Sequence, residues 1–225
     1  MLYIVATPIG NLEDMTFRAV RVLKEVDLIL AEDTRHSGIL LKHYEIKTRM
    51  SSFHTHTTQA KVEHFVRELK GVDGEAPKDM ALITDAGTPG ISDPAYVLVN
   101  AAIKAGIEVV PIPGPSAFLT ALSASGAMTN RFVYLGFLPI KKGRQTLFTA
   151  LQEEEKTIVF YEAPQRILKT LREIEKYLGE RELVIGRELT KKFEEFVRGE
   201  TSEVITHFEE KKPKGEFVVI INGKK

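Results

Sequence analysis

The sequence predicts an α/β protein made of two α/β domains, the first with a mostly parallel sheet and the second with a mixed sheet. Three observations support this fold class. Short apolar runs alternate with segments of helical periodicity along the chain. Strand-like runs outnumber helices in the second half, and several lie close enough to pair as hairpins. A stiff turn, "PIPGPS" at 111–116, separates the halves, so we expect domains at 1–113 and 114–225.

In the first half, apolar runs separated by amphipathic segments predict repeated strand–helix units. The first strand, "LYIVA" (2–6), ends at "TPIGN", and a helix is expected from about Thr16. Gly71 is expected to stop the third helix. The other expected strands are 28–32, 49–53, 80–84 and 107–113, and the other helices are 38–44, 58–71 and 95–105.

The second half opens with a helix rich in small residues, "SAFLTALSASG" (116–126), and then changes its pattern. Strands become more frequent than helices, which is typical of a mixed sheet. The expected strands are 131–139, 157–163, 182–189, 194–200 and 216–223, and the expected helices are 143–153, 165–178 and 201–210.

Composition excludes several classes of site. The chain has no cysteine, which excludes disulfides, thiolate zinc sites, iron–sulfur clusters and cysteine nucleophiles. Lys and Arg (31) balance Asp and Glu (31), so the global charge gives no support for a nucleic-acid partner. The uncharged stretch 109–130 contains prolines and glycines, which favour a turn and a packed helix over a membrane span. We expect no membrane segment, no signal peptide and a cytoplasmic protein.

Four loops that follow expected strands are rich in Gly, Pro, Ser and Thr: 7–11, 32–38, 85–94 and 113–117. Ligands of open α/β sheets bind beyond the carboxyl ends of the strands, where such loops meet. One alternative is that these are only tight turns with helix caps. The sequence has no GxGxxG after the first strand, no phosphate-binding P-loop and no GxSxG elbow. The six histidines lack metal-ligand spacing, so we expect no metal site.

Charged residues beside these loops are candidates for chemistry. In "EDTR" and the histidine that follows it, Asp33, Arg35 and His36 can face a substrate pocket. The alternative is that Asp33 or Thr34 caps a helix and Arg35 forms an ion pair. In "YEAPQR", Tyr161, Glu162 and Arg166 follow a strand of the second domain and are expected on the opposite side of a cleft between the domains. The cations of "KKGR", namely Lys141, Lys142 and Arg144, suit either a solvated turn or RNA phosphate contacts.

Several long segments resemble the tetrapyrrole methylase superfamily of S-adenosylmethionine-dependent methyltransferases, and within it the enzymes that modify small-subunit ribosomal RNA. They include "VATPIGNLEDMTFRAVRVLKEVDLILAEDTR", "SFHTHT", "ITDAGTPGISDPAYVLV", "VVPIPGPSAFLTALSASG", "FYEAPQRILKTL" and "GRELTKKFEEFVRG". The resemblance implies two α/β domains with S-adenosylmethionine in the cleft between them, usually in a homodimer. It also implies 2′-O-methylation of a cytidine in the decoding region of 16S ribosomal RNA, with the small ribosomal subunit as partner.

Matching the superfamily's cofactor motifs onto this chain implies contacts from the loops described above. The implied cofactor-binding residues are Pro8, Asp85, Ala86, Gly87, Thr88, Ser92, Ser116, Ala117 and Tyr161. One departure is that Gly87-Thr88-Pro89 stands where many members have Gly-Asp-Pro. The contact of that aspartate is therefore not carried over, and Asp85 is a candidate substitute.

A ribose hydroxyl is a weak nucleophile, so a carboxylate that accepts its proton would accelerate methyl transfer. Asp33 and Glu162 are the candidates, with Arg35 and Arg166 as phosphate or ribose clamps. An alternative function is methylation of a tetrapyrrole or another small molecule with the same cofactor. A further alternative is a module that senses the cofactor or binds RNA without catalysis.

Overall fold

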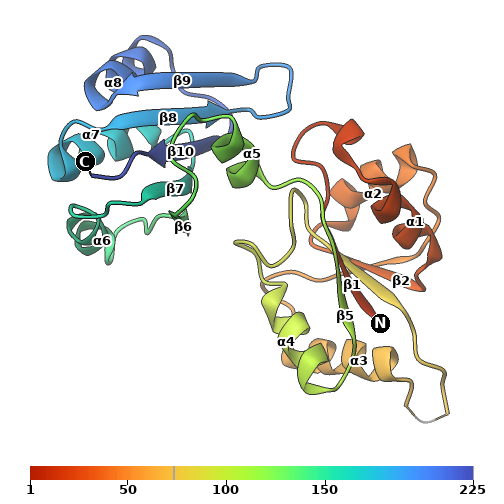
Figure 1. Cartoon of the computed structure of the whole chain (residues 1–225). Coiled ribbons are helices and arrows are strands. Elements are labelled where there is room, and N and C mark those ends of the chain that lie inside the picture. The colour runs from red at the N-terminus through yellow and green to blue at the C-terminus, as the bar shows by residue number, and fades with distance from the viewer. Residues whose placement is uncertain (73, 225) are drawn as a thin grey trace. The chain divides into compact units, whose positions relative to one another are not determined.

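The computed structural model describes residues 1–72 and 74–224 and divides into two compact units, Met1–Ser116 and Ala117 to the C-terminal end (Figure 1). The division falls after Ser116, whereas the sequence predicts a boundary after residue 113. Each unit is built around its own sheet.

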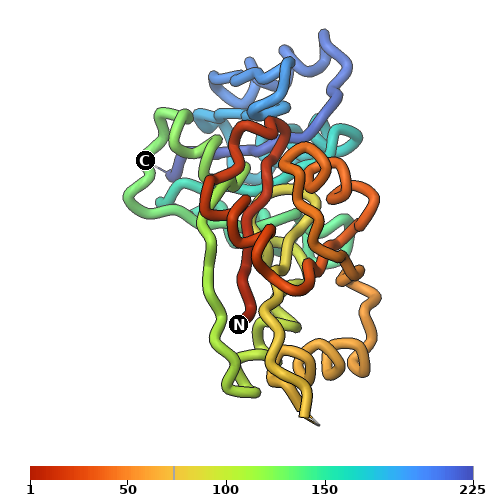
Figure 2. The backbone as a smooth tube through the Cα atoms, turned by 90° about the vertical axis from the view of Figure 1, so that its right-hand side faces the viewer, coloured from red at the N-terminus to blue at the C-terminus, as the bar shows by residue number. Residues whose placement is uncertain are grey.

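The sheet of the first unit has the strand order β3-β2-β4-β1-β5, and each of its pairings is parallel. Figures 1 and 2 both show β1 and β5 side by side. Because the strands are parallel, their carboxyl ends lie at one edge. The strands are β1 (Leu2–Val5), β2 (Leu28–Ala31), β3 (Met50–Ser52), β4 (Met80–Ile83) and β5 (Val109–Ile112).

Two layers of helices cover this sheet, as Figure 1 shows. Alternate residues of each strand face opposite cores, so that Val5 packs with α1 and α2 while Leu2 packs with α3 and α4. The two-sided burial explains why β4 reads as a continuous apolar run. The helices are α1 (Phe17–Glu25), α2 (Thr34–His43), α3 (Gln59–Lys70) and α4 (Tyr96–Lys104).

Local signals set the ends of these helices. Thr16 caps α1 by accepting a hydrogen bond from the backbone N–H of Ala19 at 3.1 Å. Gly71 ends α3 with a φ of 67°, a conformation that glycine adopts without strain. A short 3-10 helix, η1 (Leu12–Asp14), was not expected from the sequence.

The second unit has a mixed sheet of order β6-β7-β10-β8-β9. β6 and β7 are parallel, whereas β7–β10, β10–β8 and the β8–β9 hairpin are antiparallel. The strands are β6 (Phe132–Phe137), β7 (Thr157–Glu162), β8 (Glu182–Arg187), β9 (Glu195–Glu200) and β10 (Phe217–Ile221).

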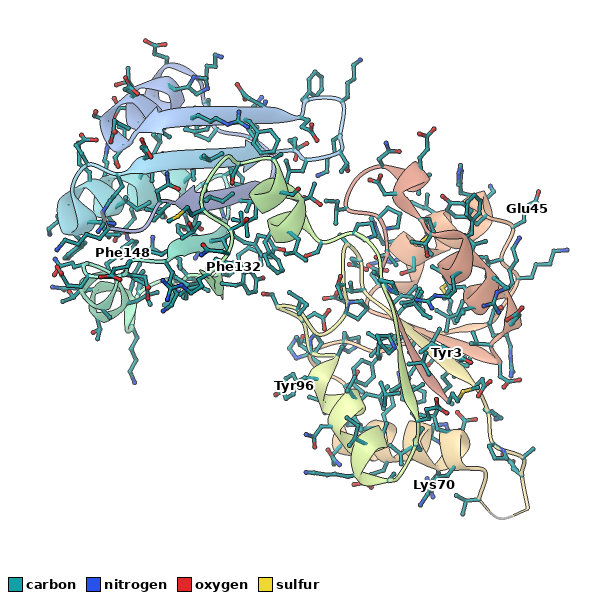
Figure 3. The ribbon with its side chains drawn as sticks, in the orientation of Figure 1. Tyr3, Glu45, Lys70, Tyr96, Phe132 and Phe148 are labelled. Carbon is teal, nitrogen blue, oxygen red and sulfur yellow. The ribbon has the colours of Figure 1, made fainter. Side chains whose placement is uncertain are left out.

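Helices cover this sheet unequally. One face packs against α6 (Arg144–Ala150), α7 (Ile167–Leu178) and α8 (Thr201–Glu210). Phe148 of α6, labelled in Figure 3, is buried in that core. The other face carries the short helix α5 (Ala117–Ser123), which contacts β7 and β10.

The structure confirms the predicted fold class, with a parallel sheet in the first unit and a mixed sheet in the second. In the described part of the chain, no helix is both long and apolar enough to cross a membrane.

Candidate functional site

The carboxyl edge of the first sheet brings together loops from β1, β2, β4 and β5. The β1 and β4 loops are joined by a pair of backbone hydrogen bonds between Thr7 and Gly87, at 2.9 and 3.0 Å. The buried Thr7 hydroxyl also donates to the carbonyl of Thr84 at 3.0 Å. Pro8 therefore follows a residue that is fixed to the β4 loop.

The β5 loop is attached to the same structure. The Thr88 hydroxyl donates to the carbonyl of Pro115 at 3.0 Å, which places the β4 loop next to Ser116. A Cβ added to Gly114 would lie 2.9 Å from the Cβ of Ala6, so glycine is needed for this close approach of the β5 loop and the β1 loop. Thus three loops of the predicted cofactor site form one hydrogen-bonded edge.

Asp33 connects the β2 loop to this edge. Its backbone N–H donates to Asp85 Oδ1 at 3.1 Å. Its side chain caps α2 by accepting from the backbone N–H groups of Arg35 and His36, and Arg35 pairs with it at 3.3 Å. The helix-cap interpretation is therefore confirmed. These hydrogen bonds, first that from the Arg35 backbone, hold the pKa of Asp33 below its usual value, which makes it a weaker proton acceptor.

The pKa values of two other carboxylates at this edge, Asp85 and Asp93, are raised instead of lowered. Partial burial raises the pKa of Asp85, and the nearby charges of Glu32 and Asp33 raise it further. Burial and the charge of Glu32 also raise the pKa of Asp93, although its Oδ1 accepts the backbone N–H groups of Gly90 and Ala95. A positively charged ligand at this edge would favour the ionised form of both carboxylates and so oppose these shifts.

Sequence reasoning missed Asp93, because "SDP" reads as an ordinary turn before a helix. The signal that was available is its place in the same glycine-rich loop as Asp85. Ala86 and Ser92 of that loop are exposed, and Ser92 has a φ of 65°. Within residues 1–72 and 74–224, no group of three or more His, Asp or Glu side chains has the arrangement of a metal site.

This donor set fits S-adenosylmethionine. The cofactor carries a sulfonium and an ammonium against one carboxylate, so its net charge is positive. Asp85 and Asp93 supply the opposite charge, and Gly114 lets the β5 loop pack closely against the β1 loop beside them.

In the second unit, Tyr161 lies at the end of β7 and belongs to a group of aromatic side chains. Its hydroxyl accepts the backbone N–H of Phe118, the residue after Ala117, at 3.3 Å. Its ring contacts Tyr134 and Phe137, with centroids 5.6 and 5.3 Å apart. Tyr161 and the start of α5 are therefore neighbours within this unit.

Glu162 points away from this group into an ionic network. Its carboxylate, which is 0% exposed, accepts the Thr170 hydroxyl at 2.6 Å and lies 2.7 Å from Arg166 and 3.7 Å from Arg144. The Ala163 backbone N–H also donates to it. This placement argues against the expected catalytic role, because the carboxylate is buried and already accepts these donors.

Arg144 requires a second correction. The sequence grouped it with exposed cations, but its side chain is 5% exposed. It donates to Glu173, to the Thr170 hydroxyl and to the carbonyl of Pro139. The "KKGR" turn is thus split, because Arg144 begins α6 and faces inward, which removes it from the RNA-binding candidates.

Lys141 and Lys142 are exposed, as the phosphate-contact interpretation requires. Arg35 is also exposed, at 92% of its side chain. Arg166 is 20% exposed and shares its guanidinium between Glu162 and the carbonyl of Leu138.

Comparison with known proteins gives one consistent result. The model of the family described as Tetrapyrrole (Corrin/Porphyrin) Methylases matches residues 1–205. Proteins named "Ribosomal RNA small subunit methyltransferase I" are similar over nearly the whole chain. The one from Synechocystis sp. is 51% identical over 99% of this chain and 79% of its own length. The one from Thermotoga maritima is 48% identical over 99% of this chain and 98% of its own.

Solved structures show the same fold at low identity. A cobalt precorrin-4 methyltransferase superposes with a TM-score of 0.71 at 15% identity, covering 98% of this chain and 94% of its own. The uroporphyrin-III-C-methyltransferase of Thermus thermophilus superposes with a TM-score of 0.66 at 19% identity, covering 97% of this chain and 93% of its own. With the match of the family model to residues 1–205, these results show that the chain belongs to the tetrapyrrole methylase family.

Proposed function

We propose that this protein transfers a methyl group from S-adenosylmethionine to a cytidine 2′-hydroxyl in the decoding region of 16S ribosomal RNA, on the assembled small subunit. The observation that carries the proposal is the hydrogen-bonded edge of the first unit, where Asp85 and Asp93 provide negative charge among close-packed loops. The names of relatives at 48–51% identity support the RNA as acceptor.

The cofactor-binding residues proposed for the first unit are those of its loops. Asp85 and Asp93 stabilise the positive charge of the cofactor. Gly87 and Thr88 hold the β4 loop in place through Thr7 and Pro115. Pro8, Ala86, Ser92 and Ser116 in the first unit, and Ala117 and Tyr161 in the second, stay proposals on the resemblance.

Asp33 acts as a positioning residue in this proposal. Its side chain fixes the start of α2, and its backbone N–H fixes Asp85. The lowered pKa weakens it as a general base, since proton-transfer efficiency rises as the pKa of the acceptor approaches the working pH.

When bound, S-adenosylmethionine supplies a methyl group on a sulfonium, which departs as a neutral thioether. The protein's contribution is to hold the acceptor hydroxyl in line and to provide the surrounding charge. Alignment of two reactants can lower the barrier by roughly 7–11 kcal/mol in favourable systems. The ordered loops suit that task, because their conformation is fixed before binding.

RNA phosphates are proposed to contact the exposed cations Lys141, Lys142 and Arg35. Binding should then weaken steeply as salt rises. The homodimer implied by the family resemblance stays a proposal, which light scattering of the purified chain would test.

The test is transfer of radiolabelled methyl groups from S-adenosylmethionine to small ribosomal subunits that lack their own modifications. Free 16S ribosomal RNA and a reduced tetrapyrrole serve as parallel acceptors. We expect label on the subunit, in a nucleotide whose 3′ linkage resists alkali because its 2′-oxygen is methylated.

Label confined to the tetrapyrrole would reject the proposal in favour of small-molecule methylation. Cofactor binding with no transfer to any acceptor would indicate a sensing or binding module. Label on a base rather than a ribose would keep the RNA substrate and reject the 2′-hydroxyl.

A further inference from the structure

Five aromatic rings form a row in the second unit, on the sheet face that carries α5. We define this aromatic row as Phe132, Phe118, Tyr134, Tyr161 and Phe137. Phe118 stacks on Tyr134, with centroids 4.3 Å apart and planes at 25°, and also lies 6.3 Å from Phe132. The Tyr161 ring then contacts both Tyr134 and Phe137. Figure 3 labels Phe132 on β6.

The row is more exposed at its ends than between them. Phe118, on α5, is 9% exposed and the two tyrosines are partly buried, whereas Phe132 is 36% and Phe137 is 58% exposed. Leaving a phenylalanine ring in water forgoes the favourable burial that its size permits. Exposure alone does not set Phe137 apart, because Phe17 and Phe193 are more exposed. Phe137 differs from them because its ring continues a row of ring contacts that reaches into the unit.

A β-bulge directs Phe137 onto this face. Tyr134 pairs with Val159, but Phe137 pairs with Tyr161, so β6 advances three residues while β7 advances two. Gly136, at a φ of 61°, supplies the extra residue. In a regular strand, position 137 would face the helices of the core, where the next residue, Leu138, is buried instead. Bulges at sheet edges often re-aim a side chain toward a site.

The sequence that follows Phe137 is cationic. No Asp or Glu occurs in the sequence between Glu108 and Glu153. Lys141 and Lys142 follow Phe137 by four and five residues, and both are exposed. β6 is also one of the two edge strands of its sheet. An exposed ring beside positive charge matches the chemistry of a single-stranded nucleic acid, which offers a base to stack and a phosphate to pair.

We propose that Phe137 is a stacking platform for an unpaired base of the RNA substrate, with Lys141 and Lys142 contacting the adjacent phosphates. This inference rests on the proposed function and adds to it a residue that recognises the RNA. Tyr161 supports Phe137 from below through their ring contact. Stacking does not discriminate strongly among bases, so the platform contributes affinity and placement.

The test measures Kd for small subunits, the KM and kcat of methyl transfer, and Kd for S-adenosylmethionine. We compare wild type with Phe137→Ala, Phe137→Trp and a control, Phe193→Ala. Phe193 is 65% exposed in the same unit and has Lys192 Nζ 5.7 Å from its ring centroid, but it lies outside the aromatic row, so it tests whether the row matters beyond exposure and charge. For Phe137→Ala we expect subunit affinity to fall about 5- to 150-fold, equivalent to the ~1–3 kcal/mol that each stacked base contributes. Phe137→Trp and Phe193→Ala should stay near wild type, with cofactor affinity unchanged throughout.

Salt dependence separates stacking from ionic contacts. Phe137→Ala should lower the logarithm of the association constant for small subunits at every salt concentration. The slope of that logarithm against the logarithm of the salt concentration should not change. Lys141→Ala with Lys142→Ala should reduce the slope, by about one for each RNA phosphate that the variant no longer neutralises.

The outcomes distinguish the two proposals. A wild type that binds and methylates no subunit rejects the proposed function itself. A wild type that methylates subunits, with Phe137→Ala no weaker than Phe193→Ala, rejects only the stacking role. Loss of cofactor affinity in Phe137→Ala, or a change in its oligomeric state by light scattering, also overturns the inference, in favour of a cofactor or subunit contact.

Discussion

Replacing Glu162 by Gln tests whether this residue holds the fold or the chemistry. The substitution keeps the shape of the side chain and removes its charge, leaving Arg144 and Arg166 without their shared carboxylate. Removing one partner of a buried ion pair costs about 3–5 kcal/mol. Arg144 keeps Glu173 at 2.7 Å, and Arg166 is partly exposed to water, so we expect about 3 kcal/mol, the lower end of that range.

The assay is urea and thermal unfolding of the whole chain, followed by circular dichroism and by hydrogen exchange of the second unit. A loss of about 3 kcal/mol corresponds to a fall in Tm on the order of 10 °C. The control is Glu209→Gln, which breaks an ion pair with Arg172 whose side chains are 46% and 63% exposed. Such surface pairs contribute under about 1 kcal/mol.

If Glu162 serves only the fold, its replacement should also leave catalytic activity largely unchanged. Well below its Tm, the folded Glu162→Gln protein should keep most of its kcat, because the carboxylate is buried among its own hydrogen-bond donors. A variant as stable as Glu209→Gln, but with kcat reduced by orders of magnitude, would refute this reasoning and restore Glu162 as a proton acceptor.

Three other predictions concern the edge of the first unit and the exposed lysines. Because the pKa of Asp93 is raised in the folded state, its ionisation opposes folding, and the free energy of unfolding falls as pH rises through that pKa. Asp93→Asn should therefore be at least as stable as wild type at neutral pH, as measured by urea titration. The same variant should bind S-adenosylmethionine more weakly, as measured by calorimetry. Gly114→Ala places a methyl group against Ala6 and should cost about 1–3 kcal/mol in the same titration, with weaker cofactor binding. Lys141→Ala with Lys142→Ala should raise the KM for small subunits at low salt and leave cofactor affinity unchanged, as measured by methyl transfer and calorimetry.

The fold was predictable because its signals are local. β4 reads as a strand since each residue of "MALI" is buried, and Thr16 and Gly71 mark helix ends by their own conformational preferences. The convergence of loops at one sheet edge also followed, since parallel strands place their carboxyl ends together.

The direction of individual side chains was less predictable. Arg144 lies one residue beyond a flexible-looking "KKG", and only the partners on α7, Thr170 and Glu173, show that it faces inward. Glu162 follows Tyr161 directly, and the alternation of a strand sends the two to opposite faces. A pattern of charged residue types therefore indicated which loops carry charged side chains but not which of those side chains are accessible.

The surroundings of Glu162 indicate a structural role, whereas those of Asp85 and Asp93 indicate a role in binding. Glu162 is fully buried, yet its charge is balanced by two guanidinium groups and its oxygens accept further hydrogen bonds, so it needs no ligand. Asp85 and Asp93 have raised pKa values because burial and neighbouring carboxylates oppose their charge. Asparagine can accept the same backbone N–H groups without that cost, so stability alone does not explain the aspartates. The proposed cofactor would explain them, because a positively charged ligand favours the ionised form that burial and neighbouring carboxylates oppose.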